Sequence, residues 1–262
     1  MDKSELTILQ PGEKEQLRLV AQLKAKKVDS GQYYGGIETA EAWKRWSEHH
    51  PLKRPPALPL DDGMTGEISV VDLGPGTGKP CASVMRSFPD RVREVICVDT
   101  SSAMLTMAME HLRGNTAAPV RGIVADFLRD ARRLAAALQA IRRPKLVLCL
   151  GNTAGNFPQR EIFAALRCLL GDGDRLLLGL GLYQAAHADE ELQALGDLFS
   201  SAANCEFGLR FLDACGGKAD HRLTFARAED DPAEAGVKVV RMCYRFPRAT
   251  VHLSNGRSFT VT

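Results

Sequence analysis

A glycine-rich turn, Asp72-Leu73-Gly74-Pro75-Gly76-Thr77-Gly78, follows a short apolar run and carries the clearest chemical signal in the chain. Glycine adopts positive φ at little steric cost and lets a ligand approach the backbone closely. A turn of this kind between a strand and a helix can hold a nucleotide phosphate, a dinucleotide, or a cofactor without phosphates. The neighbouring residues discriminate among these three ligands.

The phosphate-binding loop G-x-x-x-x-G-K-[ST] requires glycine at position 73 and a hydroxyl at position 80. The chain has Leu73 and Pro80 there, which excludes this loop despite the pair Gly78-Lys79. The dinucleotide fingerprint G-x-G-x-x-G requires glycine where Lys79 stands. An NAD-dependent oxidoreductase is therefore only a weaker alternative.

The third ligand class fits the turn best. S-adenosylmethionine carries no phosphates, and its aminocarboxypropyl arm needs a backbone turn that it can approach closely. The string Val-Val-Asp-Leu-Gly-x-Gly-Thr-Gly is similar to the corresponding motif of class I methyltransferases. We therefore expect Gly74, Gly76 and Gly78 to bind this cofactor.

An acidic residue, Asp99, stands directly after the predicted strand Glu94–Val98. A carboxylate at this strand end, about 20 residues past the glycines, can accept hydrogen bonds from both ribose hydroxyls. Capping of the next helix is an alternative role. The two roles can coexist, because Thr100 or Ser101 can cap while Asp99 binds ribose.

Two more segments follow predicted strands. Asp126 and Phe127 come after Val120–Val124, where the carboxylate could accept from an adenine amino group and the ring could pack near the base. A loop carboxylate and a core phenylalanine are an equally good interpretation. Gly151–Asn156 follows the predicted strand Leu146–Leu150, and there we expect the methyl donor and its acceptor to meet.

Apolar strands that alternate with helices predict a parallel sheet covered on both faces, with ligands at the carboxyl ends of the strands. Beyond a helical stretch at 186–204, β-branched runs at 237–246 and 249–261 predict antiparallel strands. The expected fold is thus α/β: a class I methyltransferase Rossmann-like parallel sheet with helices on both faces, plus a smaller α+β substrate-binding part. The strands are expected at 68–73, 94–98, 120–124, 146–150 and 175–182, and the helices between them at 81–88, 102–112, 131–141 and 160–170.

Composition divides the chain into three parts. Residues 1–63 form a helical segment that ends in a proline-rich linker, 64–184 the cofactor-binding domain, and 185–262 a substrate-domain segment.

The string Leu150-Gly151-Asn152-Thr153-Ala154-Gly155-Asn156-Phe157-Pro158 is distinctive. Together with Val124–Phe127 before it and Leu169–Gly179 after it, the string resembles the histidine-specific methyltransferase family. That family includes the ergothioneine-pathway enzyme that trimethylates the α-amine of histidine. The resemblance covers roughly residues 68–182, and Gln32-Tyr33-Tyr34 upstream is similar to an E-Y-Y segment of the family.

The resemblance implies a methyltransferase that acts on the amine of a small molecule, such as the amino acid histidine. A catalytically silent module that keeps the cofactor pocket is the alternative. No acid, base or metal ligand is implied, since such a reaction depends on positioning. The implied cofactor contacts are Gly74, Gly76, Asp99, Asp126, Phe127 and Gly151; Asn156 would bind the acceptor's amino-acid backbone, and Tyr33 or Tyr34 its carboxylate.

The carboxyl-terminal part departs from the family pattern. The family's Glu and Ser that contact the imidazole lie beyond the equivalent of Phe259, whereas this sequence ends at Thr262. Residues 238–262 are therefore either substrate-domain strands of a chain cut short or the closing hairpin of a shortened enzyme. A sheet edge left unpaired would favour an oligomer.

Composition narrows the range of partners. The chain has 262 residues, is 45% hydrophobic and carries a net charge of +2, which favours neither nucleic acid nor an anionic membrane. The 7 cysteines include no C-x-x-C pair, so neither a metal site nor a redox motif is expected. A charged start and the lack of an apolar run of about 20 residues lead us to expect a cytoplasmic protein.

Overall fold

The structure is a computed structural model in which contacts divide the chain into two compact units. Unit 1 comprises Met1–Gln10 and His50–Gly181, and unit 2 comprises Pro11–His49 and Leu182–Thr262. The three-part division expected from composition remains a prediction. The structure describes residues 6–8, 21–22, 24–25, 37–49, 64–88, 90–151, 153–180, 188–199, 201–208, 225–230, 238–243, 249–252 and 258–261.

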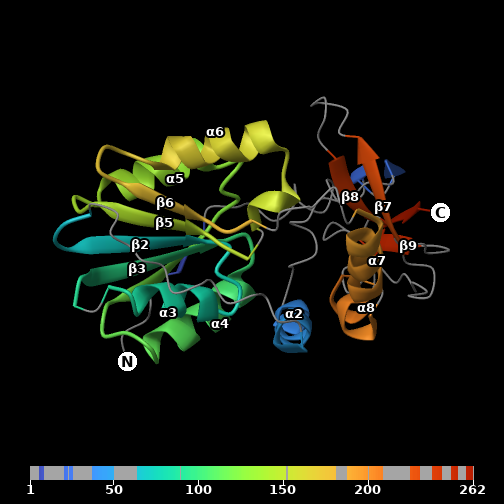
Figure 1. The fold of residues 1–262 in the computed structure, drawn as a ribbon, viewed down its shortest axis with the longest axis horizontal. Coiled ribbons are helices and arrows are strands. Elements are labelled where there is room, and N and C mark those ends of the chain that lie inside the picture. Colours follow the sequence, from blue (N-terminus) through green and yellow to red (C-terminus); the bar gives the residue numbers. More distant parts are fainter. Residues whose placement is uncertain are drawn as a thin grey trace. The chain divides into compact units, whose positions relative to one another are not determined.

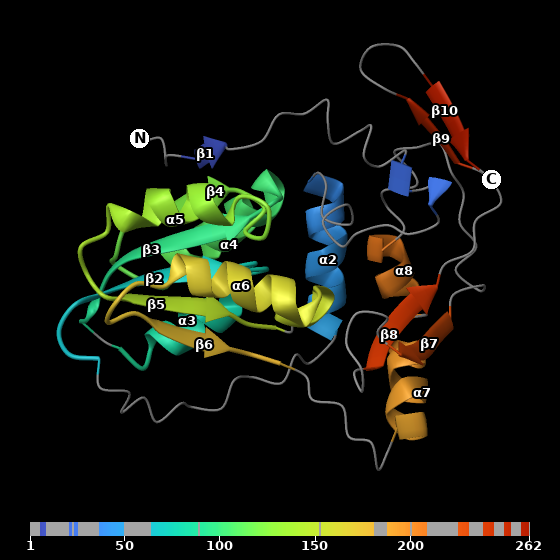
Figure 2. The same cartoon turned by 90° about the horizontal axis from the view of Figure 1, so that it is seen from above.

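Unit 1 contains a parallel sheet with the strand order β1-β4-β3-β2-β5-β6. The five predicted strands are confirmed, whereas β1 was not expected. β6 ends four residues before its predicted end and lies at one edge of the sheet (Figure 2). The strands are β1 (Leu6–Ile8), β2 (Ile68–Leu73), β3 (Val92–Asp99), β4 (Val120–Val124), β5 (Lys145–Cys149) and β6 (Arg175–Leu178).

The direction of winding reverses beside β2. The chain passes from β2 outward through β3 to β4, and then returns to the other side of β2 to form β5 and β6. In open sheets of this kind, ligands bind outside the carboxyl ends of the strands at such a reversal. This topology is that of the expected Rossmann-like fold.

Helices cover both faces of the sheet (Figure 1). α3 (Lys79–Met85) and α4 (Ser102–Arg113) lie on one face, and α5 (Ala131–Gln139) and α6 (Gln159–Leu169) lie on the other. These helices correspond to the predicted ones, although α3 begins and ends earlier than expected.

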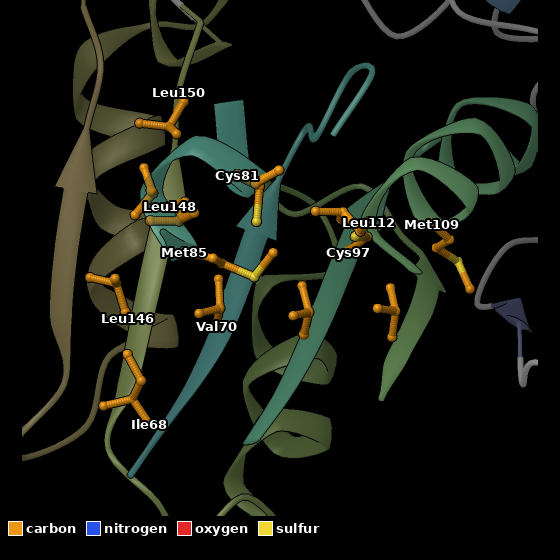
Figure 3. Close-up of a cluster of buried hydrophobic side chains, with 14 of the residues drawn as sticks. Ile68, Val70, Cys81, Met85, Cys97, Met109, Leu112, Leu146, Leu148 and Leu150 are labelled. Atoms are coloured by element: carbon orange, nitrogen blue, oxygen red, sulfur yellow. The ribbon is translucent and has the colours of Figure 1, made fainter. Parts of the chain in front are cut away.

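The strands β2 to β6 supply side chains to two cores, because successive residues of a strand point to opposite faces. Val70 of β2 and Cys81 of α3 both belong to the cluster of buried side chains under α3 and α4 (Figure 3). Val71 belongs to the cluster under α5 and α6, together with Leu134 and Ile162. Burial on both faces explains why β2 and β5 are apolar along most of their length.

Unit 2 contains the smaller α+β part. Trp46 of α2 stacks on Phe207 of α8 with ring centroids 6.2 Å apart, so these two helices pack together. The predicted antiparallel strands are confirmed, and β8 pairs with β7, which was not predicted. The elements are α2 (Ile37–His49), α7 (Ala188–Phe199), α8 (Ala202–Gly208), β7 (Phe225–Asp230), β8 (Lys238–Cys243), β9 (Ala249–His252) and β10 (Ser258–Val261). None of the helices that the structure describes has the length and apolarity needed to span a membrane.

A buried ion pair ties the amino-terminal ends of β5 and β6 together. Lys145 Nζ lies 2.7 Å from Asp174 Oδ2, and the Asp174 side chain is only 2% exposed. The same carboxylate accepts hydrogen bonds from the backbone N–H groups of Lys145 and Gly171, each at 2.7 Å. Asp174 therefore holds the loop before β6 against the start of β5.

Replacing Asp174 by alanine should lower the free energy of unfolding by about 3–5 kcal/mol, because it leaves the Lys145 ammonium buried without its partner. Urea denaturation followed by circular dichroism measures this loss. Asp172→Ala, at an exposed position in the same loop, is the matched control and should change stability by less than about 0.5 kcal/mol. Equal denaturation midpoints for the two variants would contradict the role given to the ion pair.

Candidate active site

Backbone hydrogen bonds join the segments that follow β2, β3 and β4 at the carboxyl ends of these strands. The N–H of Gly74 donates to the carbonyl of Val98 at 2.8 Å, and the N–H of Ala125 donates to the carbonyl of Asp99 at 3.0 Å. Gly151 follows β5, which pairs with β2 on its other side. The structure thus brings together the strand ends that carry most of the predicted site residues.

The glycine turn has the backbone that its sequence predicts. Gly74, Gly76 and Gly78 have φ values of +68°, +56° and +75°, a region that residues with a side chain rarely adopt. Packing also requires glycine at position 78, because a Cβ there would lie 2.8 Å from the carbonyl oxygen of Ala108 in α4. The sequence pattern alone did not indicate this second constraint.

The glycine turn touches the loop after β5. A Cβ at Gly74 would lie 2.9 Å from Cγ2 and 3.1 Å from Oγ1 of Thr153. Thr153 begins the short 3₁₀ helix η2 (Thr153–Asn156), which ends at the exposed Asn156. The predicted donor turn and the segment that carries the predicted acceptor-binding residue are therefore in contact.

Asp99 is half-buried at the end of β3, and Ser101 takes the capping role. The Ser101 hydroxyl accepts from the N–H of Met104 at 3.3 Å, while Asp99 Oδ1 accepts from the N–H of Ser101 at 2.9 Å. Burial raises the pKa of Asp99 to about 6, although hydrogen bonds from Ser101 and Thr100 act in the opposite direction. Asp99 is thus mainly an acceptor carboxylate at neutral pH.

Asp126 accepts hydrogen bonds within its own loop. Its Oδ1 accepts from the N–H groups of Leu128 and Arg129 at 3.0 and 3.2 Å, and its Oδ2 lies 3.4 Å from Arg129 Nε. Phe127 is 6% exposed and packs edge-to-face on Phe157, with ring centroids 5.5 Å apart. These contacts match the loop-and-core interpretation, and the adenine-binding roles of both residues stay predictions.

Gly151 has φ +64°, and among the described residues no heavy atom other than those of its chain neighbours lies within 4 Å of where its Cβ would be. The described residues therefore leave room beside this glycine. Tyr33 and Tyr34, the predicted carboxylate-binding residues, lie outside the described residues.

Asp72 is a buried carboxyl group to which the sequence motif assigned no role. It is 2% exposed in a strand otherwise made mostly of apolar residues. The pKa of Asp72 is raised to about 7, mainly by burial; a hydrogen bond with the Cys81 thiol acts against this rise, and the negative charge of Asp99 adds to it. A lone carboxylate inside an apolar strand was the signal in the sequence for this group.

The ionised form of Asp72 should destabilise the folded chain. Its folded-state pKa of about 7 lies above the ordinary value of 3.8, so its contribution to stability is full below pH 3.8 and is lost as the pH rises through 7. Asp72→Asn carries no such charge. The free energy of unfolding of Asp72→Asn minus that of the wild type should therefore increase by more than about 1 kcal/mol from pH 5 to pH 8.

Denaturation in urea at a series of pH values measures this difference. A stability difference between Asp72→Asn and wild type that stays constant from pH 5 to pH 8 would show that the carboxyl group has an ordinary pKa.

A shallow hollow of about 420 Å³ lies elsewhere, at the amino-terminal ends of β3 and β4. Two of its arginines pair with nearby carboxylates: Arg121 Nε lies 3.5 Å from Glu94, and Arg143 Nε lies 3.2 Å from Glu67. Because sheets of this type bind ligands at the opposite strand ends, we regard the hollow as separate from the candidate site. It is lined by Glu94, Arg121, Ala140, Ile141, Arg142 and Arg143.

Comparison with known protein families finds one match over the part of the chain that contains these strand ends. The sequence model of the family described as "Histidine-specific methyltransferase, SAM-dependent" matches residues 60–191, which is half of the chain. A search of curated proteins found no match.

Similar solved structures share low sequence identity with this chain. A putative methyltransferase from Bacillus halodurans C-125 is 15% identical, with 74% of each chain covered and a TM-score of 0.39. A SAM-dependent methyltransferase from Anabaena variabilis ATCC 29413 is 16% identical, with 80% of this chain and 94% of that chain covered and a TM-score of 0.41. An S-adenosylmethionine-dependent methyltransferase from Clostridium acetobutylicum ATCC 824 is 14% identical, with 94% and 78% covered and a TM-score of 0.37.

Proposed function

This chain belongs to the histidine-specific, S-adenosylmethionine-dependent methyltransferase family, and we propose that it methylates the amine of a small molecule, an amino acid such as histidine. Its cofactor is S-adenosylmethionine. The observation that carries the proposal is the contact between Gly74 and Thr153. Through it, the turn suited to the donor adjoins the short helix that ends at Asn156, whose carboxamide is suited to an amino-acid acceptor.

The residues at the strand ends fit the cofactor. S-adenosylmethionine supplies an electrophilic methyl group on a sulfonium. Asp99 offers a partly exposed acceptor for the ribose hydroxyls, and the described residues leave space beside Gly151. Asp126 can add a bond to the adenine amine because a carboxylate has about four lone-pair sites. The proposed cofactor contacts are Gly74, Gly76, Gly78, Asp99, Asp126, Phe127 and Gly151.

The acceptor half of the proposal depends on Asn156. A carboxamide both donates and accepts hydrogen bonds, so it can orient an amine and a carboxylate without adding charge. Tyr33 or Tyr34 is proposed to bind the acceptor carboxylate. The chain then contributes by positioning the reactants and excluding water, and the amine loses its proton to solvent.

Incubation with tritium-labelled S-adenosylmethionine and a panel of amino acids and small amines tests this function. The proposal predicts label on the amine nitrogen of one member of the panel, with histidine as the first to examine. Binding of the cofactor with no transfer to any amine would contradict the proposal and favour a catalytically silent cofactor-binding module.

Asp99→Ala and Asn156→Ala should separate the two halves of the site. Loss of the ribose acceptor should weaken S-adenosylhomocysteine binding by about 10- to 100-fold, the effect of losing charged hydrogen bonds worth roughly 1.5–3 kcal/mol. Asn156→Ala should leave this affinity nearly unchanged and lower the rate of acceptor turnover. Isothermal titration calorimetry measures the first effect and the labelling assay the second; an equal loss of cofactor affinity in both variants would contradict the assigned roles.

A further inference from the structure

Thr153 makes two hydrogen bonds to the carbonyl group of Leu150, the residue that follows β5. Its Oγ1 donates to the carbonyl oxygen of Leu150 at 2.8 Å, and its backbone N–H donates to the same oxygen at 3.2 Å. The hydroxyl bond favours one side-chain rotamer of a residue whose χ1 is already restricted by β-branching. The Thr153 side chain is therefore held in a defined direction.

That direction points at Gly74. The Cγ2 and Oγ1 atoms of Thr153 occupy the space that a side chain at position 74 would need, at 2.9 and 3.1 Å from the Cβ position. On its other side, Gly74 is held by the hydrogen bond of its N–H to the Val98 carbonyl. The glycine turn is thus held from β3 through its backbone and from β5 through Thr153.

Thr153 also begins the helix that carries Asn156. The two residues are three positions apart in η2, which is a single 3₁₀ turn, so a displacement of one end of the helix moves the other. In-line transfer requires reacting atoms about 3–3.5 Å apart, and a misplacement of 1 Å can cost about 100-fold in rate. A residue that contacts the donor turn and starts the acceptor helix can set this distance.

We propose that Thr153 is a positioning residue that holds the donor turn at Gly74 in register with the acceptor helix that ends at Asn156. This inference rests on the roles proposed above for Gly74 and Asn156. It assigns to Thr153 no contact with the reacting atoms.

Substitution of Gly74 offers a direct test, because the inference predicts that its effect depends on Thr153. Gly74→Ala introduces a methyl group that collides with Thr153. The separate cost of about 1–2 kcal/mol for an L residue at positive φ falls on the free energy of unfolding, in the double variant as in the single one. Gly66→Ala is the matched control, since Gly66 has φ +77° and no described residue beyond its chain neighbours has a heavy atom within 4 Å of its Cβ position. Gly74→Ala should weaken S-adenosylhomocysteine binding by more than about tenfold, which exceeds 1.4 kcal/mol, and Gly66→Ala should leave it within about threefold.

The double variant Gly74→Ala/Thr153→Ala isolates the contact. Removal of Cγ2 and Oγ1 leaves Thr153 Cβ as the nearest atom, at 3.7 Å, which is an ordinary van der Waals distance. The double variant should therefore recover S-adenosylhomocysteine affinity to within about threefold of Thr153→Ala alone, a non-additivity typical of residues in contact. Calorimetry measures the S-adenosylhomocysteine affinity of all variants, and circular dichroism checks that each is folded.

Turnover supplies a readout that a merely structural contact would not move. Thr153→Ala should lower kcat by more than about tenfold while KM for S-adenosylmethionine changes by less than about threefold. Thr153→Ser should recover most of kcat, because it keeps the hydrogen bond to Leu150 that fixes the start of η2.

The possible outcomes are distinct. Loss of affinity in Gly74→Ala that Thr153→Ala fails to restore overturns the inference and leaves the role of the turn intact. Unchanged affinity in Gly74→Ala overturns both the inference and the proposed role of the turn. If Gly74→Ala does not fold, a folded, ligand-binding double variant supports the inference and an unfolded one overturns it. The calorimetry needs no acceptor, so failure of the amine-methylation proposal would be seen separately in the labelling assay.

Discussion

The reversal of strand order beside β2 is the constraint on which the candidate site depends. Because β3 and β5 flank β2 on opposite sides and all three strands are parallel, the turns that follow them emerge at one edge of the sheet. The glycine turn thereby meets Asp99 on one side and Thr153 on the other.

Close approach at this edge is possible because glycine has no side chain. Gly74 makes room for Thr153, and Gly78 makes room for the backbone of α4. Packing and ligand access therefore each require glycine in this turn, for independent physical reasons. The buried Asp72 and the half-buried Asp99 place two carboxyl groups at neighbouring strand ends. Their pKa values are raised, and a cationic ligand such as a sulfonium would lower them.

Local patterns sufficed to predict much of the fold. Apolar runs bounded by turn residues identified the five central strands, and the glycine spacing identified a turn whose glycines all have positive φ. β1 escaped prediction because three residues are too short for a periodic signal. Its pairing with β4 depends on partners more than 100 residues away in the chain.

Tertiary contacts account for what the sequence could not indicate. Thr153 was one residue of a family-like string, and its contact with Gly74 exists only once β2 and β5 are neighbours. Asp126 accepts hydrogen bonds from the amides of Leu128 and Arg129, and these bonds depend on the local backbone of the loop after β4. The sequence alone therefore could not decide between a loop carboxylate and an adenine-binding one. The capping role, by contrast, fell on one of the two hydroxyl residues expected for it, Ser101.

Hydrogen–deuterium exchange with and without S-adenosylhomocysteine tests most directly whether these strand ends form one site. We expect slower amide exchange on binding at Asp72–Gly78, at Asp99–Ser101 and in the segment 151–156, with no change at the opposite sheet end around Gly171–Asp174. Protection confined to one of the three segments, or protection at Gly171–Asp174 instead, would contradict a single site at the carboxyl ends of β2, β3 and β5.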